Sequence, residues 1–163
     1  MNTNLFMILF AALFFSSCLQ HQPVGAGLEK DIASIPFTIS KSGHILTTAE
    51  INGKKAYLMI DSGASSSVIH IGKLLSLGLE SRDKKGKISG IGTSSYDVKE
   101  VIVTEMTLNS VSYPSPEFDG VDLFHVERID YYQTLDGIIG SDFLKKYDAV
   151  IDYKKQILFL KRP

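Results

Sequence analysis

The feature that most constrains this chain is a carboxylate at the end of an apolar run. Ala56–Ile60 has the composition of a buried strand and is followed at once by Asp61, Ser62 and Gly63. Burying an ionisable group costs several kcal/mol unless partners hold it. Asp61 is therefore either an ordinary strand-to-turn corner, with Ser62 and Gly63 as turn residues, or a carboxylate kept for its chemistry.

A hairpin is predicted directly before Asp61. Asn52-Gly53 separates two strand-like runs, Ile45–Ile51 and Lys54–Ile60. Asn-Gly between two such runs is the strongest short-range signal for a two-residue turn. Farther along the chain, an apolar pair flanked by glycines, Gly137-Ile138-Ile139-Gly140, leads into a segment typical of a short helix.

In this order the motifs resemble the retropepsin-like aspartic protease family, over roughly residues 35–160. The resemblance implies an all-β fold, a retropepsin-like closed β-barrel of one lobe with one or two short helices. It also implies that Asp61 is the catalytic aspartate. Ser62 would fix the neighbouring loop, Gly63 would let a backbone N–H approach the carboxylates, and Gly137 and Gly140 would belong to a structural loop.

A second glycine-rich segment lies between these motifs. By the resemblance, Lys87–Ser95 is a flap that closes over a bound peptide, with five substrate-binding residues: Ile88, Ser89, Gly90, Ile91 and Gly92. Glycines within a strand often mark a close approach of backbone to a ligand. Without the resemblance, a plain glycine-containing hairpin explains the same residues.

Peptide hydrolysis by aspartates needs two carboxylates that share one proton. Asp61 is the one good candidate, because Asp136-Gly137 lacks the hydroxyl residue between aspartate and glycine. A symmetric homodimer would bring two copies of Asp61 together. We therefore expect a homodimeric endopeptidase for extended peptides, without a cofactor. The alternative is an inactive, monomeric, lipid-anchored binding domain of the same fold.

The N-terminus has the pattern of an export signal. Leu5–Phe15 is an unbroken apolar run of 11 residues, shorter than the about 20 needed to span a bilayer. Ser16-Ser17-Cys18 follows it and resembles a bacterial lipobox, which implies a lipid on Cys18. We expect a signal peptide over 1–17, an anchor and linker over 18–34, and a protease domain over 35–163. The protein would be exported and held at the cell envelope, facing the periplasm or at the outer membrane. A buried N-terminal helix or strand is the alternative.

Composition argues against several other functions. The chain has 17 basic and 18 acidic residues and no long basic run, so nucleic-acid binding has little support. Four histidines, His21, His44, His70 and His125, lack metal-ligand spacing, and no metal site is predicted. No Gly-x-Ser-x-Gly elbow is present, and the single cysteine lies upstream of the predicted domain.

The end of the chain predicts a helix over Ser141–Tyr147, with Ser141 as N-cap, and a hairpin of Ala149–Tyr153 with Gln156–Leu160. The last strand is apolar on both faces, so it is either central to its own sheet or part of a subunit interface. The resemblance favours the interface. The segment 119–134 is either a substrate-facing loop or a surface excursion.

Overall fold

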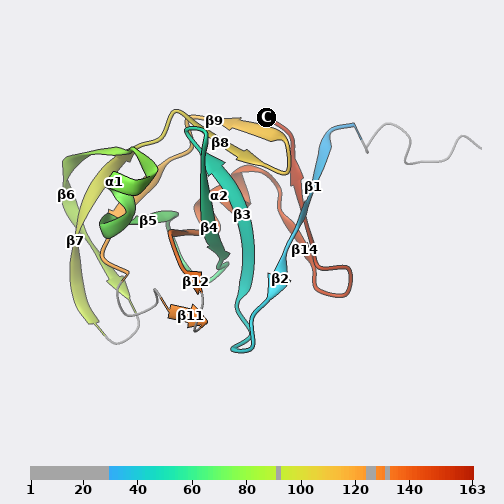
Figure 1. Ribbon diagram of the computed structural model, residues 1–163, viewed down its shortest axis with the longest axis horizontal. Helices are drawn as coiled ribbons and strands as arrows, with labels where there is room; N and C mark the ends of the chain where they lie inside the picture. Colours follow the sequence, from blue (N-terminus) through green and yellow to red (C-terminus); the bar gives the residue numbers. More distant parts are fainter. Residues whose placement is uncertain (1–29, 91–92, 124–127, 131–132) are drawn as a thin grey trace, which may run out of the picture.

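The computed structural model describes residues 30–90, 93–123, 128–130 and 133–163 (Figure 1). The predicted signal peptide and Cys18 lie outside this part of the chain. The described residues are mostly β-strand with two short α-helices, which confirms the predicted fold class. Within these residues, no helix has the length and apolar character needed to cross a membrane.

Most strands belong to one 10-stranded sheet. In spatial order its main path is β6 (Glu80–Gly90), β7 (Thr93–Ile102), β10 (Phe118–Val121), β5 (Val68–His70), β13 (Gly137–Ile139), β4 (Lys54–Ile60), β3 (Ile45–Ile51), β8 (Glu105–Leu108) and β9 (Val111–Pro114), and β2 (Thr38–Ile39) pairs with β3. Among the described residues, this pairing follows an open path and does not close into the predicted barrel.

The β3–β4 hairpin forms as its sequence predicts. The two strands pair antiparallel from Ile45–Ile60 to Ile51–Lys54. Asn52 and Gly53 both have positive φ, 48° and 78°, as the two central residues of a type I′ turn require. Alternate residues of β3 are buried, and β4 becomes fully buried toward its end. The hairpin therefore leads the chain from an exposed turn to Asp61 through the core.

A smaller sheet holds the two ends of the domain together. Its three strands are β1 (Ile32–Pro36), β15 (Ile157–Lys161) and β14 (Val150–Asp152), with β15 in the middle. β1 begins at Ile32, inside the segment expected to be linker, and its Ala33 and Ile35 bury their side chains in the core. The expected domain boundary at residue 35 therefore lies within this first strand.

The central place of β15 also corrects the predicted interface strand. Both edges of β15 pair within its own chain, so neither edge is free for a second subunit. Leu158 and Leu160 are 0 % exposed in their own subunit's core, whereas Ile157 and Phe159 are only half-buried on the opposite face. The apolar pattern thus reflects one fully buried face and one partly covered face.

Two helices close the core. α1 (Leu74–Leu77) follows a 3-10 turn (Ile71–Lys73) and ends at Gly78, whose φ of 64° is the left-handed conformation that glycine commonly adopts at a helix C-cap. α2 (Ser141–Lys146) packs Phe143 against Tyr113 of β9, with ring centroids 5.4 Å apart. The predicted N-cap is wrong, because Gly140 occupies that position and no side chain caps the helix.

The segment 119–134 contains secondary structure that its sequence did not reveal. Asp119–Val121 lies in β10, and β11 (Arg128–Asp130) pairs with β12 (Gln133–Thr134) in a two-stranded sheet. Figure 1 shows this small sheet near the end of β4 in the view, and Asp61 is the residue that directly follows β4.

Candidate active site

Asp61 follows the last residue of β4, where the buried strand reaches the surface. Its backbone N–H donates to the Ile139 carbonyl over 3.0 Å. The Gly63 N–H donates to Asp61 Oδ1 over 2.8 Å, and the Ala64 N–H donates to the Asp61 carbonyl over 3.2 Å. Asp61 is half-buried, with one carboxylate oxygen held by its own turn.

The two residues after Asp61 form an exposed turn. Ser62 and Gly63 are both exposed in the single subunit. A Cβ at Gly63 would lie 3.2 Å from Asp61 Oδ1, closer than most side chains approach an oxygen. Glycine therefore allows the backbone N–H of residue 63 to reach the carboxylate. Asp61, Ser62 and Gly63 thus lie together, as their sequence adjacency requires.

β13 brings the Gly-Ile-Ile-Gly segment beside this turn. It pairs parallel to β4, with Ile139 level with Ile60. A Cβ at Gly137 would lie 2.5 Å from the Val68 carbonyl oxygen, and one at Gly140 would collide with the Ser66 carbonyl. Both glycines are needed because two backbone segments cross at this point.

Ser67 and Asp142 form a hydrogen-bonded clamp where the chain leaves the Asp61 turn, and the sequence did not predict it. The Ser67 hydroxyl and N–H both donate to the Asp142 carboxylate, and the Ser141 N–H donates to the Ala64 carbonyl over 2.8 Å. From the sequence alone, the position of Asp142 in the first turn of a helix predicts only a favourable interaction with the helix dipole. No local signal points to Ser67, because Ser67 lies 75 positions earlier in the chain.

Asp136 does not take part in the site. Its carboxylate accepts a hydrogen bond from the Tyr57 N–H over 2.8 Å and lies 3.7 Å from Lys73 Nζ. Tyr57 precedes Asp61 by four residues, or about 13 Å along a strand. The structure thus agrees with the inference that Asp136-Gly137 is not a second catalytic motif.

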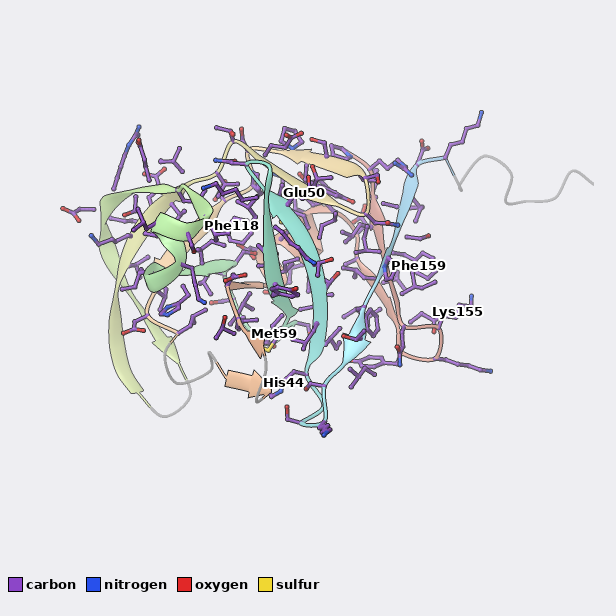
Figure 2. The ribbon with its side chains drawn as sticks, in the orientation of Figure 1. His44, Glu50, Met59, Phe118, Lys155 and Phe159 are labelled. Carbon is purple, nitrogen blue, oxygen red and sulfur yellow. The ribbon has the colours of Figure 1, made fainter. Side chains whose placement is uncertain are left out.

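An apolar cluster covers the sheet next to the Asp61 turn. It is separate from the main core and consists of buried Met59, Val68, Val121, Leu123, Leu135 and Ile138. Ala64 of the turn packs against it, as does Leu46. Figure 2 shows Met59 near the end of β4, in the part of the molecule where His44 also lies. The Asp61 turn therefore packs onto an apolar layer through Ala64.

The predicted flap is a long hairpin of β6 and β7. Ile88, Ser89 and Gly90 lie in the last part of β6, where Ile88 pairs with Tyr96. Ile91 and Gly92 lie outside the described residues. The hairpin forms one end of the molecule in Figure 1.

The histidines that the structure describes have structural partners. The Leu123 N–H donates to His70 Nδ1 over 3.0 Å, and His44 Nδ1 lies 2.8 Å from the Ser42 hydroxyl. His21 and His125 lie outside the described part of the chain. Within that part, no three His, Cys, Asp or Glu side chains are grouped in a way that could hold a metal ion.

Comparisons with known proteins agree on one family. A family model described as "Aspartyl protease" matches residues 47–143. No curated protein matches the chain. Among solved structures, a retropepsin-like aspartic protease from Rickettsia conorii is similar, with TM-score 0.55, 17% identity, and 80% of this chain and 92% of that chain covered.

Two further solved structures share the fold. The EIAV protease complexed with the inhibitor HBY-793 has a TM-score of 0.51 and 19% identity, and the match covers 67% of this chain and 92% of that chain. The retroviral protease-like domain of Ddi1 from Leishmania major has a TM-score of 0.50 and 20% identity, and the match covers 78% of this chain and 89% of that chain.

Proposed function

Because this chain belongs to the aspartyl protease family, we propose that it is an aspartic endopeptidase that works as a homodimer. The observation that carries the proposal is the setting of Asp61. Its carboxylate stands at the surface end of a buried strand, with Oδ1 held by the Gly63 N–H. One chain supplies one such carboxylate, and a two-fold axis would supply the second.

The proposed chemistry follows from the proximity of two like charges. Two carboxylates about 3 Å apart cannot both be ionised, so the pair keeps one proton. The ionised Asp61 takes a proton from a water molecule as that water attacks the peptide carbonyl, and the protonated Asp61 of the partner subunit gives its proton to the carbonyl oxygen. The first carboxyl then passes its proton to the peptide nitrogen as the C–N bond breaks, while the second carboxylate takes a proton back from a hydroxyl of the intermediate as the new carboxyl group forms. The Gly63 N–H fixes the orientation of each carboxylate during this exchange.

An extended peptide with apolar side chains is the proposed substrate. Strand-rich walls on both sides of a site suit extended peptides, because backbone groups can pair with them. Ala64 and Leu46 are half-buried and pack against the buried apolar cluster, and they support a preference for apolar side chains next to the cleaved bond. The β6–β7 hairpin would cover the peptide, with Ile88–Gly92 as its contact residues.

The test is cleavage of a peptide library by the purified protein, with and without a transition-state-mimicking aspartic protease inhibitor. We expect cleavage that the inhibitor blocks, that Asp61→Asn abolishes, and that rises with the square of protein concentration when dimers are scarce. Cleavage by Asp61→Asn at the wild-type rate would show that Asp61 is not catalytic. A folded, monomeric protein that cleaves nothing would favour the binding-domain alternative.

Lipid attachment at Cys18 is also part of the proposal, with export to the cell envelope. The apolar run Leu5–Phe15 followed by Ser16-Ser17-Cys18 supports it. In cells, Cys18→Ser should leave the precursor uncleaved or release the protein from the membrane fraction. Equal, soluble partitioning of both forms would contradict lipidation and leave ordinary secretion.

A further inference from the structure

The side-chain charge of this protein is unevenly distributed along the chain. Residues 145–163 carry six cations, Lys145, Lys146, Lys154, Lys155, Lys161 and Arg162, against the carboxylates of Asp148 and Asp152. The other residues hold 11 Lys and Arg (17 − 6) against 16 Asp and Glu (18 − 2). Residues 145–163 thus have a formal net charge of +4, whereas the rest of the chain has a formal net charge of −5. Such asymmetry is typical of proteins that contact an anionic surface.

The same segment exposes apolar side chains. Val150 is 58% exposed and Tyr153 is 61% exposed. Val150 lies opposite Phe159, which is half-buried on the outer side of the three-stranded sheet. Lys155 Nζ lies 6.0 Å from the centroid of the Phe159 ring. We call the outer side of the β14–β15 hairpin, with its turn, the hairpin face.

We propose that the hairpin face docks the folded domain onto an anionic lipid bilayer. Exposed aliphatic and tyrosine side chains suit the headgroup boundary, and the lysines around them suit its negative potential. Two ion pairs occur in this region, Lys155–Asp152 at 3.7 Å and Lys161–Asp148 at 3.9 Å. Both lysines are exposed and both distances are long, so each pair is weak. They offer little resistance to lipid contact.

The path of the chain supports a bilayer as the occupant. The N-terminal segment enters the domain through β1, and Ile32 of β1 lies opposite Lys161 of β15 in the same sheet. That segment contains the apolar run Leu5–Phe15. A chain held at a membrane by its N-terminus would thus keep this sheet within reach of the bilayer.

Docking in this way leaves the candidate active site accessible. Figure 2 shows Phe159 and Lys155 at one end of the molecule, away from Met59 and His44 near the Asp61 turn. The β6–β7 hairpin lies at the opposite end (Figure 1). The inference goes beyond the proposed protease function and does not depend on lipidation of Cys18.

The test uses the full chain, made in a cell-free system without lipid-modifying enzymes and in the presence of vesicles. Flotation with phosphatidylcholine vesicles is compared with flotation with vesicles containing 30% phosphatidylglycerol, a composition chosen as roughly that of an anionic leaflet. Residues 1–29 contain no Lys or Arg, so binding that needs anionic lipid reports on the folded domain. We expect such binding at about 0.1 M salt and its loss at about 1 M salt.

The decisive variant is Lys154→Gln/Lys155→Gln. Each cation near an anionic surface contributes roughly fivefold in partitioning, so the pair should lower the phosphatidylglycerol-dependent partition coefficient about 25-fold. The matched control, Lys55→Gln/Lys99→Gln, removes the same charge from β4 and β7 and should leave binding unchanged. All four lysines are exposed, so neither variant should disturb the core. Thermal melting followed by circular dichroism would verify that both variants are folded.

Three results would overturn the proposal. One is equal flotation on both kinds of vesicle, and another is wild-type binding by Lys154→Gln/Lys155→Gln. The third is that Val150→Asp converts a dimer into a monomer in neutral detergent without vesicles. That result would show that the hairpin face joins two copies of this chain.

Discussion

The Ser67 hydroxyl donates a hydrogen bond of 2.7 Å to Asp142 Oδ1, across 75 positions of sequence. The Ser67 N–H donates to Asp142 Oδ2 over 2.9 Å, and the Gly140 N–H donates to the Ser67 hydroxyl over 3.0 Å. Ser67 is 1% exposed, whereas Asp142 is an exposed residue, so the two bonds between them are partly buried. One carboxylate therefore ties the chain that leaves the Asp61 turn to the start of α2.

Asp142→Ala should weaken both stability and activity. It leaves the buried hydroxyl and N–H of Ser67 without their acceptor, at a cost of about 2 kcal/mol. We expect a fall in melting temperature of about 6 °C and a larger loss in kcat than in KM, because the Asp61 turn loses its support. Asp142→Asn retains one acceptor oxygen and should recover part of both.

Asp83→Ala is the matched control for this prediction. Asp83 is fully exposed and pairs weakly with Lys99 at 3.7 Å, so its removal should change stability by less than about 0.5 kcal/mol. Equal melting temperatures of Asp142→Ala and the wild type would contradict a supporting role for the clamp.

Gly140→Ala should strongly destabilise the fold. The new Cβ would meet the Ser66 carbonyl and the Ser67 N–H, which are backbone atoms that cannot move aside. We expect a loss of about 3 kcal/mol, measured by urea unfolding. Gly43→Ala is the comparison: a Cβ there meets nothing within 4 Å, and only its φ of +89° opposes the change. Its cost should be about 1 kcal/mol, and similar losses for both variants would refute the close-approach argument.

Asp61→Asn should abolish proteolysis without unfolding the subunit, since an amide keeps the shape of the carboxylate and lacks its proton chemistry. In the proposed dimer the change also removes repulsion between like charges. Sedimentation equilibrium should then show a dimer at least as stable as the wild type. A variant dimer that dissociates at higher concentrations than the wild type would contradict pairing of the two carboxylates.

Tyr113→Phe should stabilise the protein. Among the described residues, the Tyr113 hydroxyl is buried and has no hydrogen-bond partner. Replacing an unpaired buried hydroxyl by hydrogen removes a desolvation cost of about 1 kcal/mol at neutral pH. Tyr153→Phe, at a position 61% exposed, should change nothing measurable.

Tyr113→Phe should also change how the free energy of unfolding depends on pH above pH 10. Burial, the main cause, raises the pKa of Tyr113 to about 12, and the nearby Arg162 opposes the shift. Below pH 10 the hydroxyl is protonated in both the folded and unfolded chains. Between pH 10 and 12 the unfolded chain releases this proton more readily, so stability falls as pH rises, by up to roughly 3 kcal/mol. The Tyr113→Phe variant should lack this decline in stability. If its free energy of unfolding falls with pH as steeply as that of the wild type, the pKa of Tyr113 is not raised by burial.

Much of the Asp61 site could be predicted from the sequence because it is local. The Asn52-Gly53 turn needs only two residues with positive φ, and the alternating pattern of β3 places the strands in register. Asp61, Ser62 and Gly63 are adjacent, so the bond from the Gly63 N–H to the carboxylate spans two residues. Gly78 likewise ends α1 through its own backbone conformation. The order of these motifs was enough to indicate the family.

Only the tertiary structure decided the contacts between distant segments. The apolar residues of β15 fit either a central strand or an interface, and pairing with β1, more than 120 residues earlier, made it central. Asp142 looked like a helix-dipole residue until Ser67 was brought within 2.7 Å. The alternation of apolar and polar residues indicates which face of a strand is buried. It does not indicate which segment covers that face, because that segment can lie far away in the sequence. Local geometry therefore determined Asp61 and its turn, while long-range packing determined what holds that turn in place.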